Sequence, residues 1–191
     1  MRLKVREDIE RLLEIAIEKG ALKYGDFTLS SGKHSSYYFD GRLLSLDPEG
    51  AFLIGKALYP LVNSSGAEAI GGPTLAADPV VTAVSITSQM NGSGIPAFIV
   101  RKEAKEHGMT NLIEGPVKPG SKVSIVDDTC TTGGSLLHAI KAAESIGCEV
   151  VQVLAILDRR EGGQEILAEH GYNFTALMAA NSEGVIEVVQ D

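Results

Sequence analysis

The chain has 191 residues, of which 44% are hydrophobic and 22% are charged, and its formal net charge is −8. This composition is typical of a folded globular chain and excludes extensive disorder. The negative charge argues against a nucleic-acid-binding protein that works by bulk electrostatics. We therefore expect no nucleic-acid partner, and any anion site must be local.

The sequence gives no sign of membrane insertion or of an oxidising compartment. No apolar run approaches the roughly 20 residues needed to cross a bilayer. The charged start "MRLKVREDIERLL" lacks the apolar core of a signal peptide. The two cysteines, Cys130 and Cys148, have neither CxxC nor Cys/His metal spacing, which favours reduced thiols. These features predict a cytoplasmic protein without a membrane partner.

The N-terminal part is expected to form a small hood outside the main sheet. Apolar spacing over residues 9–17 predicts an amphipathic helix that ends near Gly20. The next stretch, "LKYGDFTLSSGKHSSYYFDGR", has a Gly-rich turn between two aromatic, β-prone pieces and predicts a hairpin. The pair Asp47 and Pro48 then predicts a capped helix that runs to about residue 61.

From residue 67 onward, predicted strands and helices alternate. We expect strands over 67–71, 97–100, 122–126, 149–157 and 172–178, and helices over 78–90, 134–146 and 164–170. This order favours an α/β fold with a mostly parallel central sheet of about five strands, flanked by helices. No repeat or linker is visible. We predict a single domain over residues 1–191, with the hood at about 1–45 and the core at about 46–191.

Three polar segments follow successive predicted strands, at the sheet edge where α/β folds bind ligands. They read "GGPTLAAD", "RKEAKEHG" and "DDTCTTGGS". The third segment leads directly into a predicted helix. Backbone N–H groups and hydroxyls in such a loop surround a phosphate, and the helix dipole adds a favourable field. Because neither GxxxxGK[ST] nor GxGxxG is present, an ATP γ-phosphate and a dinucleotide are both disfavoured.

The adjacent acids Asp127 and Asp128 distinguish this loop from other phosphate loops. Carboxylates accept hydrogen bonds from vicinal hydroxyls, so an acid pair beside a phosphate loop suits a ribose 5-phosphate. The alternative is a plain strand end followed by a helix cap, which an isolated acid pair would favour. The complete order of strand, acids, small-residue loop and helix disfavours that alternative.

The second segment gathers the cations Arg101, Lys102, Lys105 and His107 in an otherwise acidic chain. Such cations neutralise a departing pyrophosphate when the segment closes over it. The alternative is a solvated charged turn, since two glutamates offset part of the charge. Taken alone, the segment favours that alternative.

The acid pair, the small-residue loop and the cationic segment together resemble the type I phosphoribosyltransferases. "FTLSSGKHSSYYFD", "RKEAKEHGMTNLIEG" and "ILDRR" are similar to the orotate-specific branch, over roughly residues 22–160. The resemblance implies Mg²⁺-dependent phosphoribosyl transfer from 5-phosphoribosyl 1-diphosphate to orotate, which gives orotidine 5′-monophosphate and pyrophosphate in pyrimidine biosynthesis. Two alternatives stay open: a phosphoribosyltransferase for another base, and a non-catalytic regulator that senses the diphosphate.

The resemblance also implies roles for individual residues. Those implied to bind the diphosphate donor are Arg101, Lys102, Lys105, His107, Asp127, Asp128, Thr129, Cys130, Thr131, Thr132, Gly133, Gly134 and Ser135. Those implied to bind orotate are Thr131, Arg159, Tyr38 and Phe39. The implied catalytic residues are Arg101, Lys105, His107 and Asp128.

The same resemblance implies the partners. Mg²⁺ is expected to be held mainly through substrate and water, as its octahedral preference favours. A homodimer is expected in which the cationic segment reaches the site of the neighbouring subunit. Arginine suits the orotate carboxylate because it forms a two-pronged hydrogen bond. Without the family, a surface arginine would be an equally good interpretation of Arg159, and the aromatic residues would be interpreted as ordinary core or hairpin aromatics.

The chain departs from the family pattern at two positions. Many members have a lysine where this chain has Ser30, and another near the position of Ala76. Backbone N–H groups around residues 74–77 are therefore expected to do more of the diphosphate binding. Cys130 is either an oxidation-sensitive loop thiol or a small hydrophobic filler.

Overall fold

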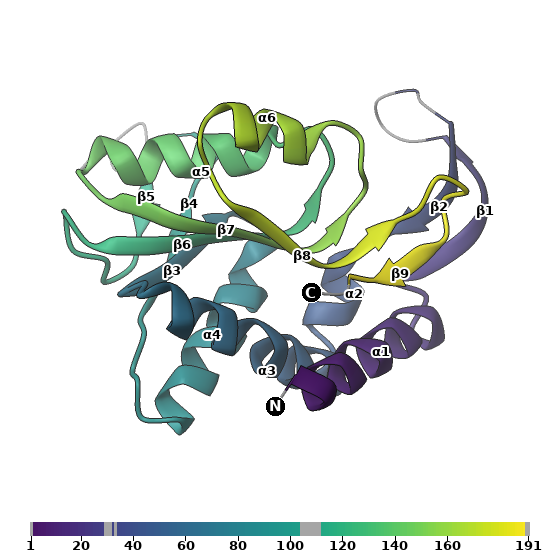
Figure 1. Ribbon diagram of the computed structural model, residues 1–191, viewed down its shortest axis with the longest axis horizontal. Helices are drawn as coiled ribbons and strands as arrows, with labels where there is room; N and C mark the ends of the chain where they lie inside the picture. Colours follow the sequence, from purple (N-terminus) through teal and green to yellow (C-terminus); the bar gives the residue numbers. More distant parts are fainter. Residues whose placement is uncertain (1, 29–31, 33, 104–111, 190–191) are drawn as a thin grey trace.

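The structure is a computed structural model that describes residues 2–28, 32, 34–103 and 112–189. The described strands form a seven-stranded sheet, in the order β5-β4-β3-β6-β7-β8-β9, and a separate β1-β2 pair (Figure 1). Their bounds are β1 Leu22–Thr28, β2 His34–Phe39, β3 Ala69–Pro73, β4 Ala97–Val100, β5 Ile113–Glu114, β6 Lys122–Cys130, β7 Glu149–Asp158, β8 Phe174–Ala180 and β9 Ile186–Val188.

Helices cover both faces of the large sheet. Their bounds are α1 Arg2–Glu18, α2 Gly41–Ser45, α3 Pro48–Ser65, α4 Ala77–Met90, α5 Gly134–Ser145 and α6 Gly163–Glu169. Figure 1 shows α5 and α6 on one face, and α1, α3 and α4 on the other. Each face has its own buried apolar cluster, and neighbouring residues of β6 alternate between them: Ile125 belongs to one and Val126 to the other. The result is a three-layer α/β arrangement.

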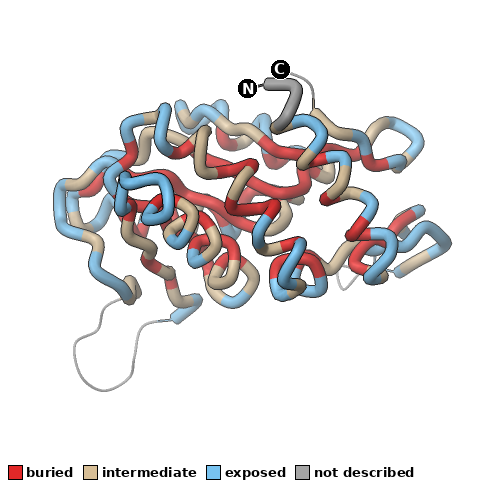
Figure 2. Tube along the Cα trace, turned by 90° about the horizontal axis from the view of Figure 1, so that it is seen from below, coloured by how far each residue is buried: buried red, intermediate tan, exposed pale blue. Residues whose placement is uncertain are grey.

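Burial follows these layers. Buried residues run along the inner strands and the sheet-facing sides of the helices, while exposed residues lie on the outside (Figure 2). None of the helices in the described part of the chain is long and apolar enough to cross a membrane.

The predicted α/β class is confirmed, and so are the five predicted strands. β4, β3, β6, β7 and β8 are mutually parallel, in that order across the sheet. The expected number of strands was too low, because β5 and β9 add short antiparallel edges. These two strands have two and three residues, which is too short for period-2 alternation to be visible in the sequence.

The acid pair occupies a different place from the one predicted. Strand β6 does not end at Val126 but continues to Cys130, so Asp127 and Asp128 lie within the strand. The extension pairs with β7 as far as Cys130 opposite Asp158. Polar residues are poor strand formers in isolation, and here the neighbouring strand supplies the hydrogen-bonding partners.

The capped helix after the hood is confirmed at its start and is longer than predicted. Asp47 Oδ1 accepts hydrogen bonds from the N–H groups of Glu49 and Gly50, both at 3.1 Å, and a proline occupies the first turn. The helix includes Pro60 and ends at Ser65, and the residue that caps it, Gly66, has φ 75°. Proline disfavours but does not forbid a packed helix, and here α3 continues past it.

The predicted hairpin is confirmed as a sheet of its own. β1 and β2 pair antiparallel, and Tyr24 Oη accepts a hydrogen bond from the N–H of Ile186, which ties the hairpin to β9. The short helix α2 was not predicted. It begins where Asp40 Oδ1 accepts a hydrogen bond from the N–H of Arg42 at 3.1 Å.

Candidate active site

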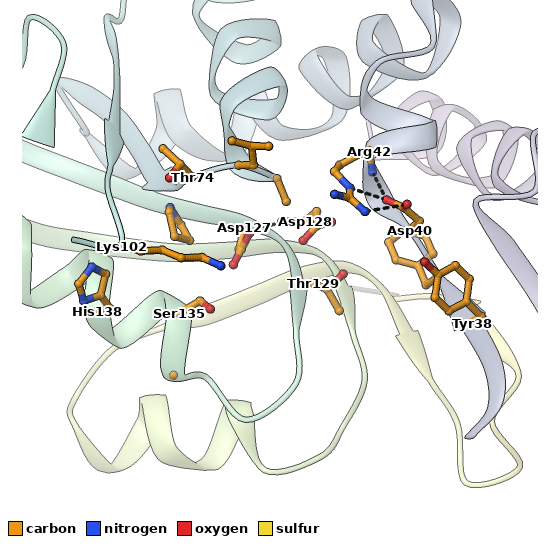
Figure 3. Close-up of a pocket in the computed structure, with 15 residues that line it drawn as sticks. Tyr38, Asp40, Arg42, Thr74, Lys102, Asp127, Asp128, Thr129, Ser135 and His138 are labelled. Carbon is orange, nitrogen blue, oxygen red and sulfur yellow. Dashed lines mark hydrogen bonds and ion pairs between the residues drawn. The ribbon is translucent and has the colours of Figure 1, made fainter. Parts of the chain in front are cut away.

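A pocket of about 580 Å³ lies at the carboxyl ends of β3 and β6, between the hood and α5 (Figure 3). Four separate parts of the chain line it: residues 38–42 from β2 and α2, the turn 73–76 before α4, residues 127–129 of β6, and the start of α5. Lys102 completes the lining. The pocket therefore lies at the sheet edge where the sequence predicted a site.

Asp127 and Asp128 lie on the wall of this pocket and strongly influence each other. Asp127 is only 6% exposed, and its Oδ1 accepts a hydrogen bond from the Asp128 N–H at 2.9 Å. Burial raises the pKa of Asp127 well above its ordinary value, and the charge of Asp128 adds to the effect. Burial also raises the pKa of Asp128. Burial thus makes the negative charge of this pair unfavourable, and a bound cation or a hydrogen-bond donor would stabilise it.

The hood lies directly against the acid pair. A Cβ placed on Gly41 would lie 2.5 Å from Asp128 Oδ2, so this approach requires a glycine. Next to it, Arg42 forms a two-pronged ion pair with Asp40, with Nε–Oδ1 and Nη2–Oδ2 both at 2.9 Å. The guanidinium holds the pKa of Asp40 below its usual range. Both charged residues line the pocket.

The predicted phosphate loop forms a small concavity of its own, about 80 Å³, lined by residues 129–136. Gly133 precedes α5 with φ 77°, and no side chain caps this helix among the described residues. The first N–H groups of α5 therefore lack side-chain acceptors, as an anion site requires. Gly163 braces the loop from α6, donating from its N–H to the Thr131 carbonyl at 3.0 Å.

Cys130 is a buried filler beneath this loop. Its side chain is fully buried, and a Cβ placed on Gly163 would lie 2.4 Å from its Sγ. Burial raises the pKa of the thiol to about 12, so little thiolate is present near neutral pH. Of the two alternatives for Cys130, the geometry favours the hydrophobic filler. Both cysteines are free and buried.

A second helix begins at the pocket, opposite the loop. The turn from Pro73 to Ala76 lines the pocket and leads into α4, whose N-cap, Ala76, makes no side-chain capping hydrogen bond. The N–H of Thr74 already donates to the Val100 carbonyl at 2.9 Å. That the N–H groups around residues 74–77, where many family members have a lysine, take part in diphosphate binding stays a prediction. The other departure, Ser30, lies outside the described residues.

Arg159 lies beside the hood and does not line the larger pocket. Its guanidinium stacks on the ring of Tyr37, with Cζ 4.5 Å from the ring centroid. Its Nε donates to Glu161 at 3.0 Å and its Nη2 donates to Ser35 Oγ at 3.1 Å. With 7% of its side chain exposed, it is not the surface arginine of the alternative interpretation. Two of these contacts, Tyr37 and Ser35, lie on β2, the strand that carries Tyr38.

The cationic segment is described only in part. Lys102 lines the pocket, and Figure 3 shows its side chain extending toward Asp127. Arg101 does not line the pocket; its Nη1 lies 3.6 Å from Glu114 Oε1. Lys105 and His107 lie outside the described residues.

The structure thus brings together most, but not all, of the predicted site residues. The predicted residues that line one or both cavities are Tyr38, Phe39, Lys102, Asp127, Asp128, Thr129, Cys130, Thr131, Thr132, Gly133, Gly134 and Ser135. Sequence reasoning missed Asp40, Arg42 and His138, which also line the larger pocket. The signal for His138 was its position three residues after Ser135 on a helix, which places the two on one face.

The donor set suits an ion that arrives with a substrate better than one held in a protein cage. Among the described residues, no group of three or more His, Cys, Asp or Glu side chains gathers as a metal cluster would. Within the part of the chain that the structure describes, only the acid pair and the ion-paired Asp40 bring carboxylates to the pocket. An octahedral Mg²⁺ that keeps several waters needs no larger donor set than this.

The phosphoribosyl transferase domain family matches residues 75–173, which is more than half of the chain. The chain therefore belongs to the phosphoribosyltransferases. It is 46% identical over 174 residues to the orotate phosphoribosyltransferase of Aquifex aeolicus, covering 90% of this chain and 93% of that relative. The corresponding enzyme of Rhodopirellula baltica is 42% identical over 175 residues, covering 88% and 91%. Within its family, the chain belongs with the orotate phosphoribosyltransferases.

A solved structure agrees with this assignment. The orotate phosphoribosyltransferase of Mycobacterium tuberculosis H37Rv, in a crystal structure with 5-phospho-alpha-D-ribosyl 1-diphosphate, superimposes with a TM-score of 0.75. It is 35% identical, and the match covers 90% of this chain and 96% of that one. The fold similarity extends over most of both chains.

Proposed function

We propose that this chain transfers the phosphoribosyl group from 5-phosphoribosyl 1-diphosphate to orotate, giving orotidine 5′-monophosphate and pyrophosphate. One observation carries the proposal: α4 and α5 begin at the same pocket without side-chain caps, with the acid pair between them. A ligand with a phosphate at each end and hydroxyls in the middle matches this arrangement.

The donor's groups are assigned to subsites by their chemistry. The 5-phosphate fits the loop 129–135, where N–H groups and hydroxyls gather at the start of α5. Asp127 and Asp128 accept hydrogen bonds from the ribose hydroxyls. The diphosphate extends toward the turn before α4 and toward Lys102, which lines the same pocket.

Orotate is assigned to the side of the pocket nearest the hood. Tyr38 and Phe39 line the pocket there and offer ring faces to a pyrimidine. Arg159 is proposed to receive the orotate carboxylate, since its guanidinium is already held flat by stacking on Tyr37. Thr131, on the loop between these groups, is proposed to contact both substrates.

Catalysis is proposed to rest on positioning and charge stabilisation, without a protein nucleophile. The bond from ribose C1 to the diphosphate oxygen breaks, its electron pair leaves with pyrophosphate, and orotate N1 bonds to C1. Positive charge develops on the ribose near the acid pair. Negative charge develops on the leaving group, where Arg101, Lys105 and His107 are proposed to act. Asp128 is proposed to assist in moving the N1 proton.

Mg²⁺ is proposed to enter with the donor and to be held through the diphosphate, the ribose hydroxyls and water. When bound, it would neutralise charge on the diphosphate. Asp127 and Asp128 would orient its water ligands, which suits two carboxylates whose pKa values burial has raised. Removal of the ion with a chelator is expected to abolish turnover and to weaken donor binding.

A homodimer is proposed in which the cationic segment of one subunit, apart from Lys102, which lines its own subunit's pocket, reaches the other's pocket. Supporting this, three neighbouring helices and the turn before α4 expose large apolar side chains, namely Leu43, Leu46, Phe52, Leu75, Ile86 and Met90. Leu75 is 69% exposed and also lines the pocket, so a partner seated on this surface would lie beside the site. Sedimentation of a Phe52→Glu variant tests this: the wild type should be a dimer and the variant a monomer.

The reaction is tested by mixing protein, orotate, Mg²⁺ and the donor and recording the loss of orotate absorbance. Parallel assays with uracil, hypoxanthine and adenine test the alternative bases. Binding of the donor without pyrophosphate release in the presence of orotate would favour the regulator instead. A cytoplasmic location, the absence of a nucleic-acid partner and a single domain over 1–191 stay predictions from the sequence.

A further inference from the structure

His138 connects two parts of the site that are distant in sequence. It lies on α5, the helix that begins at the phosphate loop, and its ring lines the pocket. Its Nε2 is 2.9 Å from the backbone carbonyl oxygen of Arg101, which precedes Lys102. Figure 3 shows the ring on the same side of the pocket as Lys102 and Ser135. Thirty-seven residues separate the two bonded groups.

The chemistry of this contact fixes its direction. A backbone carbonyl can only accept a hydrogen bond, so the Nε2 of His138 must carry the hydrogen and donate it. Both the neutral ring with hydrogen on Nε2 and the imidazolium can do this. The contact therefore does not require His138 to exchange a proton during the reaction.

The contact completes the anchoring of the Arg101 backbone, whose N–H and C=O belong to two successive peptide units. The N–H of Arg101 donates to the Leu112 carbonyl at 2.8 Å, and its carbonyl accepts from His138. Because the N–H and the carbonyl of Arg101 are both hydrogen-bonded, the direction of the backbone at Lys102, just after β4, is set. Its ammonium extends toward Asp127, where it partly offsets the rise in that carboxyl's pKa (Figure 3).

We infer that His138 is a positioning residue: its hydrogen bond to the Arg101 carbonyl holds Lys102 where it meets the donor's diphosphate. This inference rests on the proposed function, because it takes the diphosphate as the ligand of Lys102. It assigns to α5 a second role beside the phosphate loop. The same helix that receives the 5-phosphate at its first turn sets the position of a cation for the diphosphate one turn later.

The variants His138→Leu, His138→Gln and His138→Asn separate this role from others. Leucine removes the donor at similar size, glutamine places an N–H at nearly the same reach as Nε2, and asparagine is too short. The control is His170→Leu, because the His170 ring hydrogen-bonds the Ile166 carbonyl of its own helix, at 2.8 Å, and lines neither cavity. Circular dichroism and thermal melting establish that each variant is folded.

Calorimetric titration with 5-phosphoribosyl 1-diphosphate and Mg²⁺, without orotate, is the primary measurement. The dissociation constant of the donor should rise about five- to tenfold in the leucine and asparagine variants, because each loses one hydrogen bond. It should return to within about twofold of wild type in the glutamine variant. The KM for orotate should change less than the donor's dissociation constant. The His170 control should match wild type.

A double-mutant comparison tests the route through Lys102. If His138 acts by placing that ammonium, His138→Leu should weaken donor binding little further in a Lys102→Met background. Wild-type donor affinity in the leucine variant, failure of glutamine to restore binding in a folded protein, or additive losses in the double mutant would each overturn the inference. A wild-type protein that does not bind the donor would overturn the proposed function itself, which is a separate result.

Discussion

The guanidinium of Arg159 lies over the ring of Tyr37, 4.5 Å from its centroid, on the side of the hood that faces β7. Ser35 and Glu161 hold two of its nitrogens, so the planar group is fixed before any ligand arrives. Preorganisation of this kind lowers the entropy lost when a planar anion binds. The hood and the end of β7 are therefore joined by direct contacts, although the sequence separates them by more than a hundred residues, and we propose that together they recognise orotate.

Replacing Tyr37 with leucine is expected to weaken orotate binding more than donor binding. The stacking partner of Arg159 is lost, and the expected rise in the KM for orotate is about three- to tenfold. Tyr37→Phe keeps the ring and is the matched control. Its hydroxyl has no hydrogen-bond partner among the described atoms, so the phenylalanine variant should melt at an equal or higher temperature. Equal orotate KM values in both variants would contradict the role assigned to the stack.

Gly41→Ala is expected to displace Asp128 and reduce turnover. The added Cβ would lie 2.5 Å from a carboxylate oxygen, and a carboxylate moved by a fraction of an ångström no longer meets the ribose hydroxyls well. We expect kcat/KM to fall by about ten- to a hundredfold in a protein that still folds. Ser45→Ala is the control in the same helix, since its buried hydroxyl has no partner among the described atoms. Wild-type kinetics in Gly41→Ala would show that Asp128 tolerates the displacement.

Asp127→Asn is expected to stabilise the protein while abolishing its activity. The folded-state pKa of Asp127 is raised, so the folded protein binds more protons than the unfolded chain at pH values between the two pKa values. Stability is therefore lost as pH rises through that range, and the ionised carboxylate destabilises the fold at neutral pH. The gain in melting temperature should be present at pH 7.5 and absent near pH 3.

The exposed Glu183 provides the control for this experiment. Glu183→Gln lies on a surface turn and should leave the melting temperature within about 1 °C of wild type at both pH values. A melting temperature of Asp127→Asn below that of wild type at pH 7.5 would contradict the raised pKa of Asp127.

The raised pKa values of Asp127 and Asp128 also predict that wild-type kcat/KM falls as the pH is lowered, because the protonated pair can no longer accept hydrogen bonds from the ribose hydroxyls.

Cys130 is expected to resist alkylation in the folded protein. At a pKa of about 12, its thiolate population at pH 8 is about a thousandfold lower than that of an ordinary thiol, and the sulfur is fully buried. Iodoacetamide treatment of a Cys148→Ala variant, followed by mass spectrometry, should show labelling only after unfolding. Rapid labelling of the native protein would favour the oxidation-sensitive alternative.

Features that depend on residues close together in the chain could be predicted from the sequence. The loop after β6, the Asp47 cap and the five parallel strands could all be predicted, because each depends on residues adjacent in the chain. His138 and Arg42 could not be assigned in the same way. Arg42 lies on α2, a helix that was not predicted, and it lines the pocket because the hood packs beside the sheet. His138 lies one turn into α5, and its partner, the Arg101 carbonyl, comes from a distant part of the chain.

Long-range pairing also explains the misplaced strand end. The sequence 127–130 has no apolar alternation, and only the ladder to β7 holds it extended. Tyr37 is a further example: three consecutive aromatic residues look alike in sequence, yet Tyr37 is buried beneath Arg159 while Tyr38 is 40% exposed and lines the pocket. The choice between them follows from the pleat of β2, which no local pattern in "SSYYFD" reveals.

The pairing of β6 with β7 fixes the distance between two parts of the site and so limits the length of a ligand that can span them. Cys130 pairs with Asp158, and the N–H of Arg159 donates to the Cys130 carbonyl at 2.9 Å, so the two strands stay bonded up to the last residue before the arginine. The span from the acid pair to the backbone of Arg159 is then fixed by hydrogen-bonded strands. A nucleotide whose base and sugar are spaced differently would have to break strand pairing to be accepted.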